Sequence, residues 1–183
     1  MPDDPTTPIL MYFVLPLWIA AGFADWLCHR AARIELTSGT KESVLHLVQF
    51  GEIGIALLAG LFLHINAGLI ALMILVFLVH ELTAWWDVSY AVGARKVPPA
   101  EQHVHSFLEM LPLVALVCVV SLYWAQFQSL VGIGGADPDF ALRWKEQPLP
   151  TGYLMAVLGA AAALVVIPFI EELVRCVRAD RRS

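Results

Sequence analysis

Charged residues are scarce in this sequence. Only 15% of its 183 residues are charged, whereas 59% are hydrophobic. The mean hydropathy of +0.72 lies well outside the range that is usual for soluble chains. This composition excludes a soluble globular protein, and it equally excludes an intrinsically disordered chain, which would need low hydrophobicity and high charge.

Basic residues and cysteines are also few. Eleven Lys and Arg residues stand against sixteen Asp and Glu residues, which gives a formal net charge of −5. Nucleic-acid binding depends on neutralising phosphates with clustered cations, so we expect no nucleic-acid partner. The cysteines Cys28, Cys118 and Cys176 have neither the number for a disulfide framework nor the paired spacing of a zinc ribbon.

Long apolar runs make up more than half of the sequence. A helix needs about 20 residues to cross the hydrocarbon core of a bilayer. A span must be helical, because lipid cannot satisfy backbone N–H and C=O groups. Apolar runs of this length occupy residues 9–28, 44–65, 68–87, 106–127 and 152–173. The sequence therefore predicts an all-α, polytopic membrane protein with five transmembrane helices, and residues 1–183 form a single integral membrane domain.

Basic residues predict the orientation of these spans. They gather in the segments between spans one and two, between spans three and four, and after span five: Arg30, Arg33, Lys41, Arg95, Lys96, Arg175, Arg178, Arg181 and Arg182. The positive-inside rule assigns these segments to the cytoplasm. We therefore expect an N-out, C-in topology in a bacterial inner (plasma) membrane, with the acidic start at residues 1–4 outside. We also expect the first span to be retained as an anchor, since no basic region precedes it.

Ionisable residues inside the spans gather toward the cytoplasmic side. Such residues are costly in lipid and usually face a bundle interior or a cavity. Residues four apart on a helix differ by about 40°, and residues seven apart by about 20°. Each of the first four spans thus presents acid and histidine on one face: Asp25 with His29, Glu42 with His46, His80 with Asp87, and Glu101 and Glu109 with His105. This pattern predicts that helices one to four form an antiparallel bundle around a metal site.

The residue types narrow the choice of metal. The predicted metal ligands are Asp25, His29, Glu42, His46, His80, Asp87, His105 and Glu109. Glu52, the deepest acid, and Glu109 are predicted to be catalytic, and Glu101 is a further candidate at the water boundary. Carboxylates and imidazoles without thiolate suit iron, manganese or zinc. Because one zinc ion is satisfied by three protein ligands and a water, this many buried carboxylates favours two iron ions.

The four-helix portion, roughly residues 20–110, resembles the di-iron carboxylate bundles of the ferritin-like class and, more loosely, the membrane-bound di-iron oxygenases and desaturases. The resemblance is one of ligand chemistry. The chain has Glu42-x3-His46 and Glu101-x3-His105, whereas ferritin-like proteins use Glu-x2-His. The resemblance implies O2 activation and the hydroxylation or desaturation of a lipophilic substrate, such as an acyl chain, a sterol-like molecule or an isoprenoid. An external reductase would then be the electron-donating partner.

Other functions remain open on the sequence. One is a zinc-dependent hydrolase of a membrane lipid, similar in ligand type to the ceramidase-like hydrolases; its ligands would be, for example, His29, His80, His105 and Asp25, with Glu109 as the base. Another is a b-type cytochrome, in which the same three histidines and His46 would be axial haem ligands. A metal or proton transporter agrees less well with the pattern, because the helices are almost wholly apolar beyond Glu52 and Glu109.

The fifth span is expected to serve only in packing. Its acids, Glu171 and Glu172, lie near the basic end of the span, where a local pairing with Arg175 would satisfy them. A run of small residues at 159–163 permits close approach of another helix. We therefore expect this span to pack against the bundle or in a homodimer, without contributing to the metal site.

Overall fold

A computed structural model describes residues 4–182 of the chain. Most of the acidic start on which the predicted orientation partly depends, residues 1–3, lies outside the described residues. The helices in chain order are α1 (Thr6–Ile9), the π-helical η1 (Leu10–Val14), α2 (Leu15–Ala32), the 3-10 turn η2 (Ile34–Leu36), α3 (Gly39–Phe62), α4 (Ala67–Ala94), α5 (Pro99–Leu122), α6 (Trp124–Leu130), α7 (Thr151–Ala161), the π-helical η3 (Ala162–Val166) and α8 (Ile167–Asp180).

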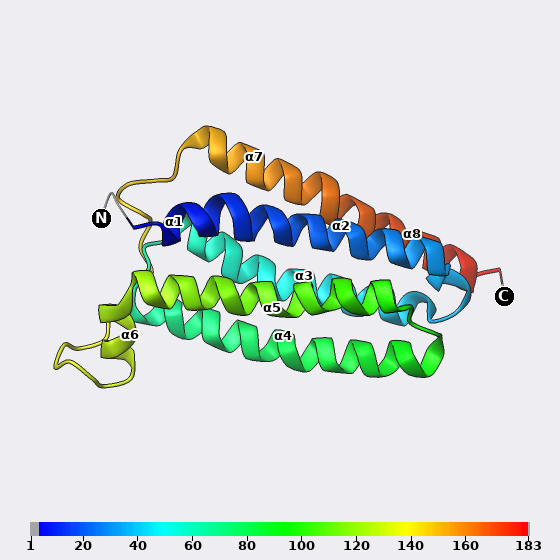
Figure 1. The fold of residues 1–183 in the computed structure, drawn as a ribbon, viewed down its shortest axis with the longest axis horizontal. Coiled ribbons are helices and arrows are strands. Elements are labelled where there is room, and N and C mark those ends of the chain that lie inside the picture. The colour runs from blue at the N-terminus through cyan, green and yellow to red at the C-terminus, as the bar shows by residue number, and fades with distance from the viewer. Residues whose placement is uncertain (1–3, 183) are drawn as a thin grey trace.

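Five continuous helical stretches are long and apolar enough to span a membrane. They are Thr6–Ala32, Gly39–Phe62, Ala67–Ala94, Pro99–Leu122 and Thr151–Asp180. Figure 1 shows them lying lengthwise beside one another, with α6 as a short extra helix at one end. No β-strand forms within residues 4–182, where Leu63 and Trp144 make an isolated bridge. The prediction of an all-helical chain with five potential spans is confirmed.

Local sequence explains where several of these helices begin and end. The Asn66 side chain accepts a hydrogen bond from the Leu69 amide at 3.0 Å, and so caps the first turn of α4. Pro99 begins α5, a position where its missing N–H has no helical partner to lose. At the other end of a helix, Arg33 takes a left-handed conformation (φ 51°) and stops α2.

Two prolines inside the spans follow widened helical turns. The π-helical segments η1 and η3 end just before Pro16 and Pro168, respectively. A proline removes one helical N–H donor, and its ring crowds the carbonyl four residues earlier. A wider turn before the proline relieves this crowding, so the first and fifth spans each continue through their proline as one helix.

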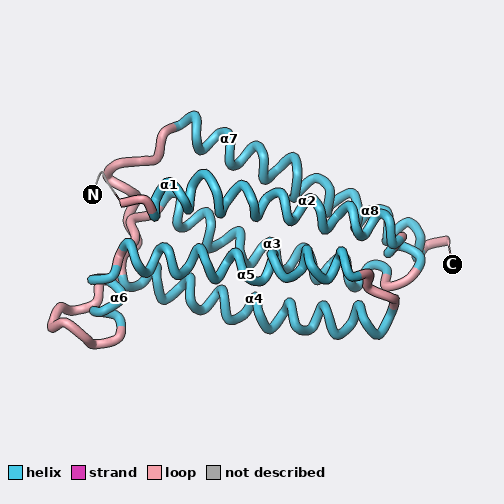
Figure 2. The backbone as a smooth tube through the Cα atoms, viewed as in Figure 1, coloured by secondary structure: helices cyan, strands magenta, loops and turns pink. Residues whose placement is uncertain are grey.

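The connections lie at the two ends of the long helices, as Figure 2 shows. The α2–α3 connection (33–38), the α4–α5 connection (95–98) and the end of α8 lie together, and we call this the site end. The start of α1, the α3–α4 connection (63–66) and the loop after α6 lie at the opposite, far end.

The two halves of the molecule bury different kinds of side chain. In the far half, a core cluster consists of Ala59, Ile65, Leu69, Ile70, Met73 and Val119. In the half toward the site end, carboxylates and imidazoles are buried instead. The outer surface carries large apolar side chains, such as Leu82 at 65% and Trp85 at 73% exposure, which suits contact with lipid. Charged groups are therefore concentrated inside one half of a largely apolar molecule.

Candidate metal centre

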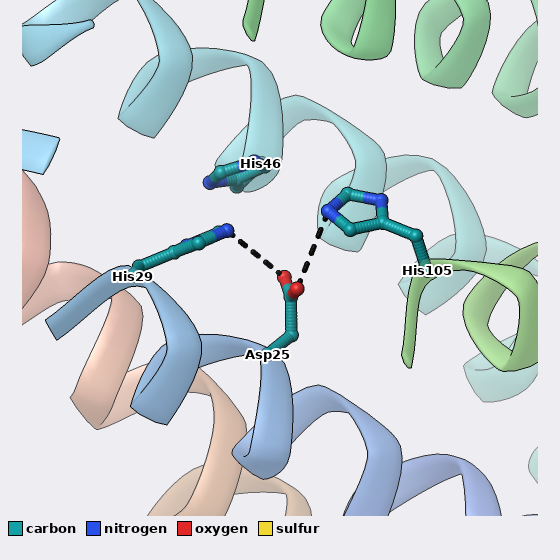
Figure 3. A group of neighbouring side chains, drawn as sticks. All are labelled: Asp25, His29, His46 and His105. Carbon is teal, nitrogen blue, oxygen red and sulfur yellow. Dashed lines mark ion pairs between the residues drawn. The ribbon is translucent and has the colours of Figure 1, made fainter. Parts of the chain in front are cut away.

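Four potential ligands from three helices converge in the interior near the site end. They are Asp25 and His29 of α2, His46 of α3 and His105 of α5, and each offers a ligand atom within 4.8 Å of the others (Figure 3). The Asp25 carboxylate lies between two imidazoles. Its Oδ2 is 3.5 Å from His29 Nε2, and its Oδ1 is 3.3 Å from His105 Nε2. The rings of His29 and His46 are stacked, with their centroids 4.4 Å apart.

These residues are almost completely withdrawn from the surface. Asp25 is 1%, His29 0% and His46 3% exposed, whereas the His105 side chain retains 16% exposure. Packing of α2 against α5 and of α3 against α8 brings the four residues together. Of these four residues, His105 is therefore the one whose side chain reaches the molecular surface.

Glu172 of α8 contacts the Nδ1 atoms of two of the imidazoles. Its Oε2 lies 3.0 Å from His29 Nδ1, and its Oε1 lies 3.3 Å from His46 Nδ1. An ionised carboxylate only accepts hydrogen bonds, so each Nδ1 carries the proton and donates it to Glu172. Nε2 is the second nitrogen of each ring: it holds the lone pair in a neutral imidazole and carries a second proton in an imidazolium.

The fifth span therefore does more than pack. A local pairing of both acids with Arg175 was expected, and this is wrong for Glu172, which is 0% exposed and bonds to His29 and His46. Neither acid belongs to a ligand group among the described residues, so the expectation that this span supplies no metal ligand stays a prediction. Glu171, the neighbour of Glu172, is the acid that pairs with Arg175, through a contact of 3.5 Å. Adjacent helical residues point about 100° apart, and this was the available signal that only one of the two acids could pair with the basic end.

Several buried polar atoms in this cluster have no hydrogen-bond partner within residues 4–182. They are Asp25 Oδ1, His29 Nε2, His46 Nε2 and Asp87 Oδ1. Asp87 of α4 is 1% exposed, and its Oδ2 lies 3.0 Å from His46 Nε2 in an ion-pair contact. Unsatisfied buried acceptors are costly and rare in native proteins. Their convergence indicates that the cluster accommodates a cation or additional protons.

A second group of potential ligands adjoins the first, closer to the site end. His29, Glu42 and Glu101 offer ligand atoms within 4.8 Å of one another, and His29 Nε2 lies 3.6 Å from Glu101 Oε1. Here a guanidinium already binds both carboxylates. Arg95 Nε donates to Glu42 at 3.2 Å, Nη1 donates to Glu101 at 3.0 Å, and Nη2 contacts both acids.

The Arg95 side chain is an unexpected part of the interior. Burial opposes its charged form, but the hydrogen bonds and negative charges of Glu101 and Glu42 outweigh burial and raise the pKa of Arg95 above its ordinary value. Sequence analysis treated Arg95 only as a loop cation. Its position directly after α4 allows it to fold back between the two acids, which no periodicity in the sequence indicates.

Two predicted ligands, His80 and Glu109, lie apart from both groups. His80 Nδ1 is 3.6 Å from Glu52 Oε2, and Glu52 Oε1 accepts a hydrogen bond from the Thr83 hydroxyl at 2.8 Å. By helical rise, Glu52 lies about 9 Å beyond His46 along α3, and His80 lies about 10 Å from Asp87 along α4. Glu109 belongs to neither ligand group. Of the predicted ligands, the structure thus brings together Asp25, His29, Glu42, His46, Asp87 and His105, with Glu101 beside them.

No protein-family model matches the chain, and neither a curated protein nor a solved structure is significantly similar to it.

Proposed function

We propose that the protein is a membrane metalloenzyme with one divalent metal ion, held by Asp25, His29, His46 and His105. Zinc is the ion that we propose, and hydrolysis of an ester or amide bond in a lipophilic molecule is the reaction. The observation that carries this proposal is the bidentate contact of Glu172 with the Nδ1 atoms of His29 and His46.

Glu172 provides the hydrogen-bond acceptor that metal-binding histidines usually have on their second ring nitrogen. A ligating histidine almost always donates its second ring N–H to a carboxylate, carbonyl or water, which fixes the tautomer and the ring orientation. Here one buried carboxylate does this for two rings, and both Nε2 atoms face other carboxylates of the cluster: His29 Nε2 lies 3.5 Å from Asp25 Oδ2, and His46 Nε2 lies 3.0 Å from Asp87 Oδ2. Three imidazoles and one carboxylate in one group form a ligand set that suits zinc.

The charge balance of the cluster also supports a cation. With neutral imidazoles, the buried carboxylates of Asp25, Asp87 and Glu172 carry a formal charge of −3. Uncompensated charge at this depth is strongly unfavourable. A divalent ion between the imidazoles would change the net charge of the cluster from −3 to −1. It would also coordinate lone pairs that form no hydrogen bond.

The composition of the second ligand group favours a centre with one metal ion over a centre with two. Glu42 and Glu101 already share the guanidinium of Arg95, which lowers the formal charge of this pair from −2 to −1. The Nε2 atom of His29 belongs to both groups, and a single lone pair binds one ion only. The stacking of His29 on His46 at 4.4 Å likewise disfavours haem, because no porphyrin fits between rings at that separation.

In this proposal the ion would polarise the carbonyl of the substrate and activate the attacking water. Asp87 would accept the proton of that water at Oδ1 and pass it to the departing alcohol or amine as the ester or amide bond breaks. Glu172 would keep the imidazoles of His29 and His46 in the Nδ1-protonated form. Phe169, which is 0% exposed, lies edge-on to both rings at 6.0 and 5.7 Å and would exclude water from behind them.

The surroundings of the cluster favour a substrate that comes from the bilayer. The ligands lie within spans whose outer surface is apolar, and His105 is the ligand with the largest exposure. The α2–α3 and α4–α5 connections at the site end contain the basic residues Arg33 and Lys96, so the positive-inside rule supports a cytoplasmic location for the cluster. The proposed substrate is therefore a lipid-like molecule in the cytoplasmic leaflet.

A di-iron oxidase or oxygenase acting on a lipophilic substrate is the second candidate. The observation that favours it is the proximity of the His29, Glu42 and Glu101 group to the first ligand group. Two ions would then bind side by side, with O2 and an external reductase as co-substrate and partner. This arrangement requires Arg95 to leave both carboxylates, and another residue to replace His29 in one of the groups.

Metal analysis and an oxygen-free assay together test the proposal. Purified protein is expected to contain about one zinc ion per chain and to cleave short-chain lipid esters or amides without O2. The His105→Ala variant should lose both properties, whereas the matched control His103→Ala, an exposed histidine of the same helix, should keep them. A content of about two iron ions with O2-dependent lipid modification would establish the second candidate instead.

A further inference from the structure

The far half of the molecule contains an apolar cavity that the proposed metal centre does not use. Its volume is about 190 Å³, and it is lined by α1, η1, α2, α3, α4, α5, α7 and the loop before α7. Ile53, Phe77 and Pro112 line its inner end. Ile53 lies seven residues beyond His46 along α3, so about 10 Å of helix separates the cavity from the metal centre.

The shape of the cavity suits one extended chain. Its lining on α5 extends from Pro112 to Leu122, which corresponds to about 15 Å along the helix axis. A volume of about 190 Å³ is small for a ligand site, which favours one chain over two. The lining between the two ends is aliphatic, with Ala56, Leu116 and Val119 among its members.

A cation lies at the mouth of the cavity. Lys145 lines the far-end opening together with Thr7 and Tyr153. Its backbone amide donates to Phe62 O at 3.0 Å, which fixes the residue against the end of α3, and its ammonium donates to Leu63 O at 2.9 Å. Within residues 4–182, Lys145 forms no ion pair with a carboxylate. Burial disfavours its charge and lowers the pKa of Lys145 below the ordinary lysine value.

We propose that this cavity binds a single-chain anionic amphiphile of the fatty-acid class, with the carboxylate on Lys145 and the chain directed toward Phe77. The ammonium has donors beyond the one used on Leu63 O, and a carboxylate would both accept them and neutralise a partly desolvated charge. Burial of the chain in an aliphatic cavity supplies the remaining affinity. This site does not depend on the proposed metal centre, so either proposal can fail alone.

Photocrosslinking of the full chain in phosphatidylcholine nanodiscs tests the site. The probe is dodecanoate with a diazirine at the chain end, and unlabelled dodecanoate, dodecanol and dodecylamine serve as competitors. The expected crosslinks fall on the inner end of the cavity, around Ile53, Phe77 and Pro112. Dodecanoate should compete at least about tenfold better than dodecanol, because only the carboxylate gains the charge-assisted bonds to Lys145.

Paired variants separate the roles of charge and cavity. Lys145→Met should weaken dodecanoate binding about tenfold or more, whereas Lys145→Arg and the exposed control Lys96→Met should not. Ala115→Leu fills the cavity and should abolish crosslinking, whereas Val114→Leu, beside it but outside the lining, should preserve it. The helical circular-dichroism signal and the melting temperature should be unchanged in every variant, which shows that each is folded. Equal competition by dodecanol, or unchanged affinity in Lys145→Met, would overturn the proposal.

Discussion

Replacement of Glu172 by Gln is the sharpest perturbation of the candidate metal centre. The substitution conserves the volume of a side chain that is 0% exposed, so it leaves the packing of α8 intact. Glutamine offers one carbonyl oxygen in place of two carboxylate oxygens. It can therefore accept from the Nδ1–H of either His29 or His46, and its amide N–H groups would face the donor of the other ring.

The expected magnitude follows from the two contacts that Glu172 makes, at 3.0 and 3.3 Å. Loss of a hydrogen-bond partner behind a metal-ligating histidine typically weakens metal binding 10- to 100-fold, or roughly 1.4–2.8 kcal/mol. Competition between the purified protein and a chelator for zinc measures this change. We expect the zinc dissociation constant of Glu172→Gln to rise at least tenfold.

The neighbouring residue provides the matched control. Glu171 has a side chain that is 41% exposed and pairs with Arg30 at 3.1 Å, on the surface of the same helix. Surface ion pairs of this kind contribute about 0–1 kcal/mol to stability, and Glu171 contacts none of the ligands. Glu171→Gln should therefore bind zinc like the unchanged protein. Equal zinc affinity in the two variants, both folded, would refute the assigned role of Glu172.

Three further predictions concern other parts of the structure. His46→Ala should lose most of the bound metal, whereas His80→Ala, whose imidazole lies beside Glu52 and outside the cluster, should retain it; metal analysis of both proteins compares them. Arg95→Met should lower the free energy of unfolding by about 3–5 kcal/mol, because two buried carboxylates lose their cation, whereas Lys96→Met should change it by less than about 0.5 kcal/mol in the same denaturation assay. Asn66→Ala should cost about 1–2 kcal/mol through loss of the α4 cap; an unchanged melting temperature would show that the cap is not needed.

The lengths of the apolar runs predicted the five potential spans, and helical periodicity predicted several of the residues that cluster in the interior, because both depend on local regularities. The five apolar runs became five long helices, and the acid–histidine pairing of Asp25 with His29 placed both on the inner face of α2. Boundaries were less accurate. The predicted fourth span ended at residue 127, but α5 stops at Leu122, because Tyr123 leaves the helical conformation within an unbroken apolar run.

Contacts between distant segments lay beyond this reasoning. His80 and Asp87 share a helix face, yet they are about 10 Å apart along it, and only Asp87 reaches His46. Glu172 and Arg95 enter the interior from segments that sequence analysis assigned to packing and to a loop. Their roles depend on which helices pack together, and hydrophobic periodicity contains no information about that pairing.

The metal content and coordination of the purified protein test the central claim most directly. Elemental analysis combined with X-ray absorption at the metal edge gives both the number of ions and the nature of the ligands. We predict about one zinc ion per chain, with three imidazole nitrogens and carboxylate oxygen in its first shell, and loss of this signal in His29→Ala. A folded protein that binds no zinc when zinc is supplied, or a metal signal that persists without His29, would contradict the account.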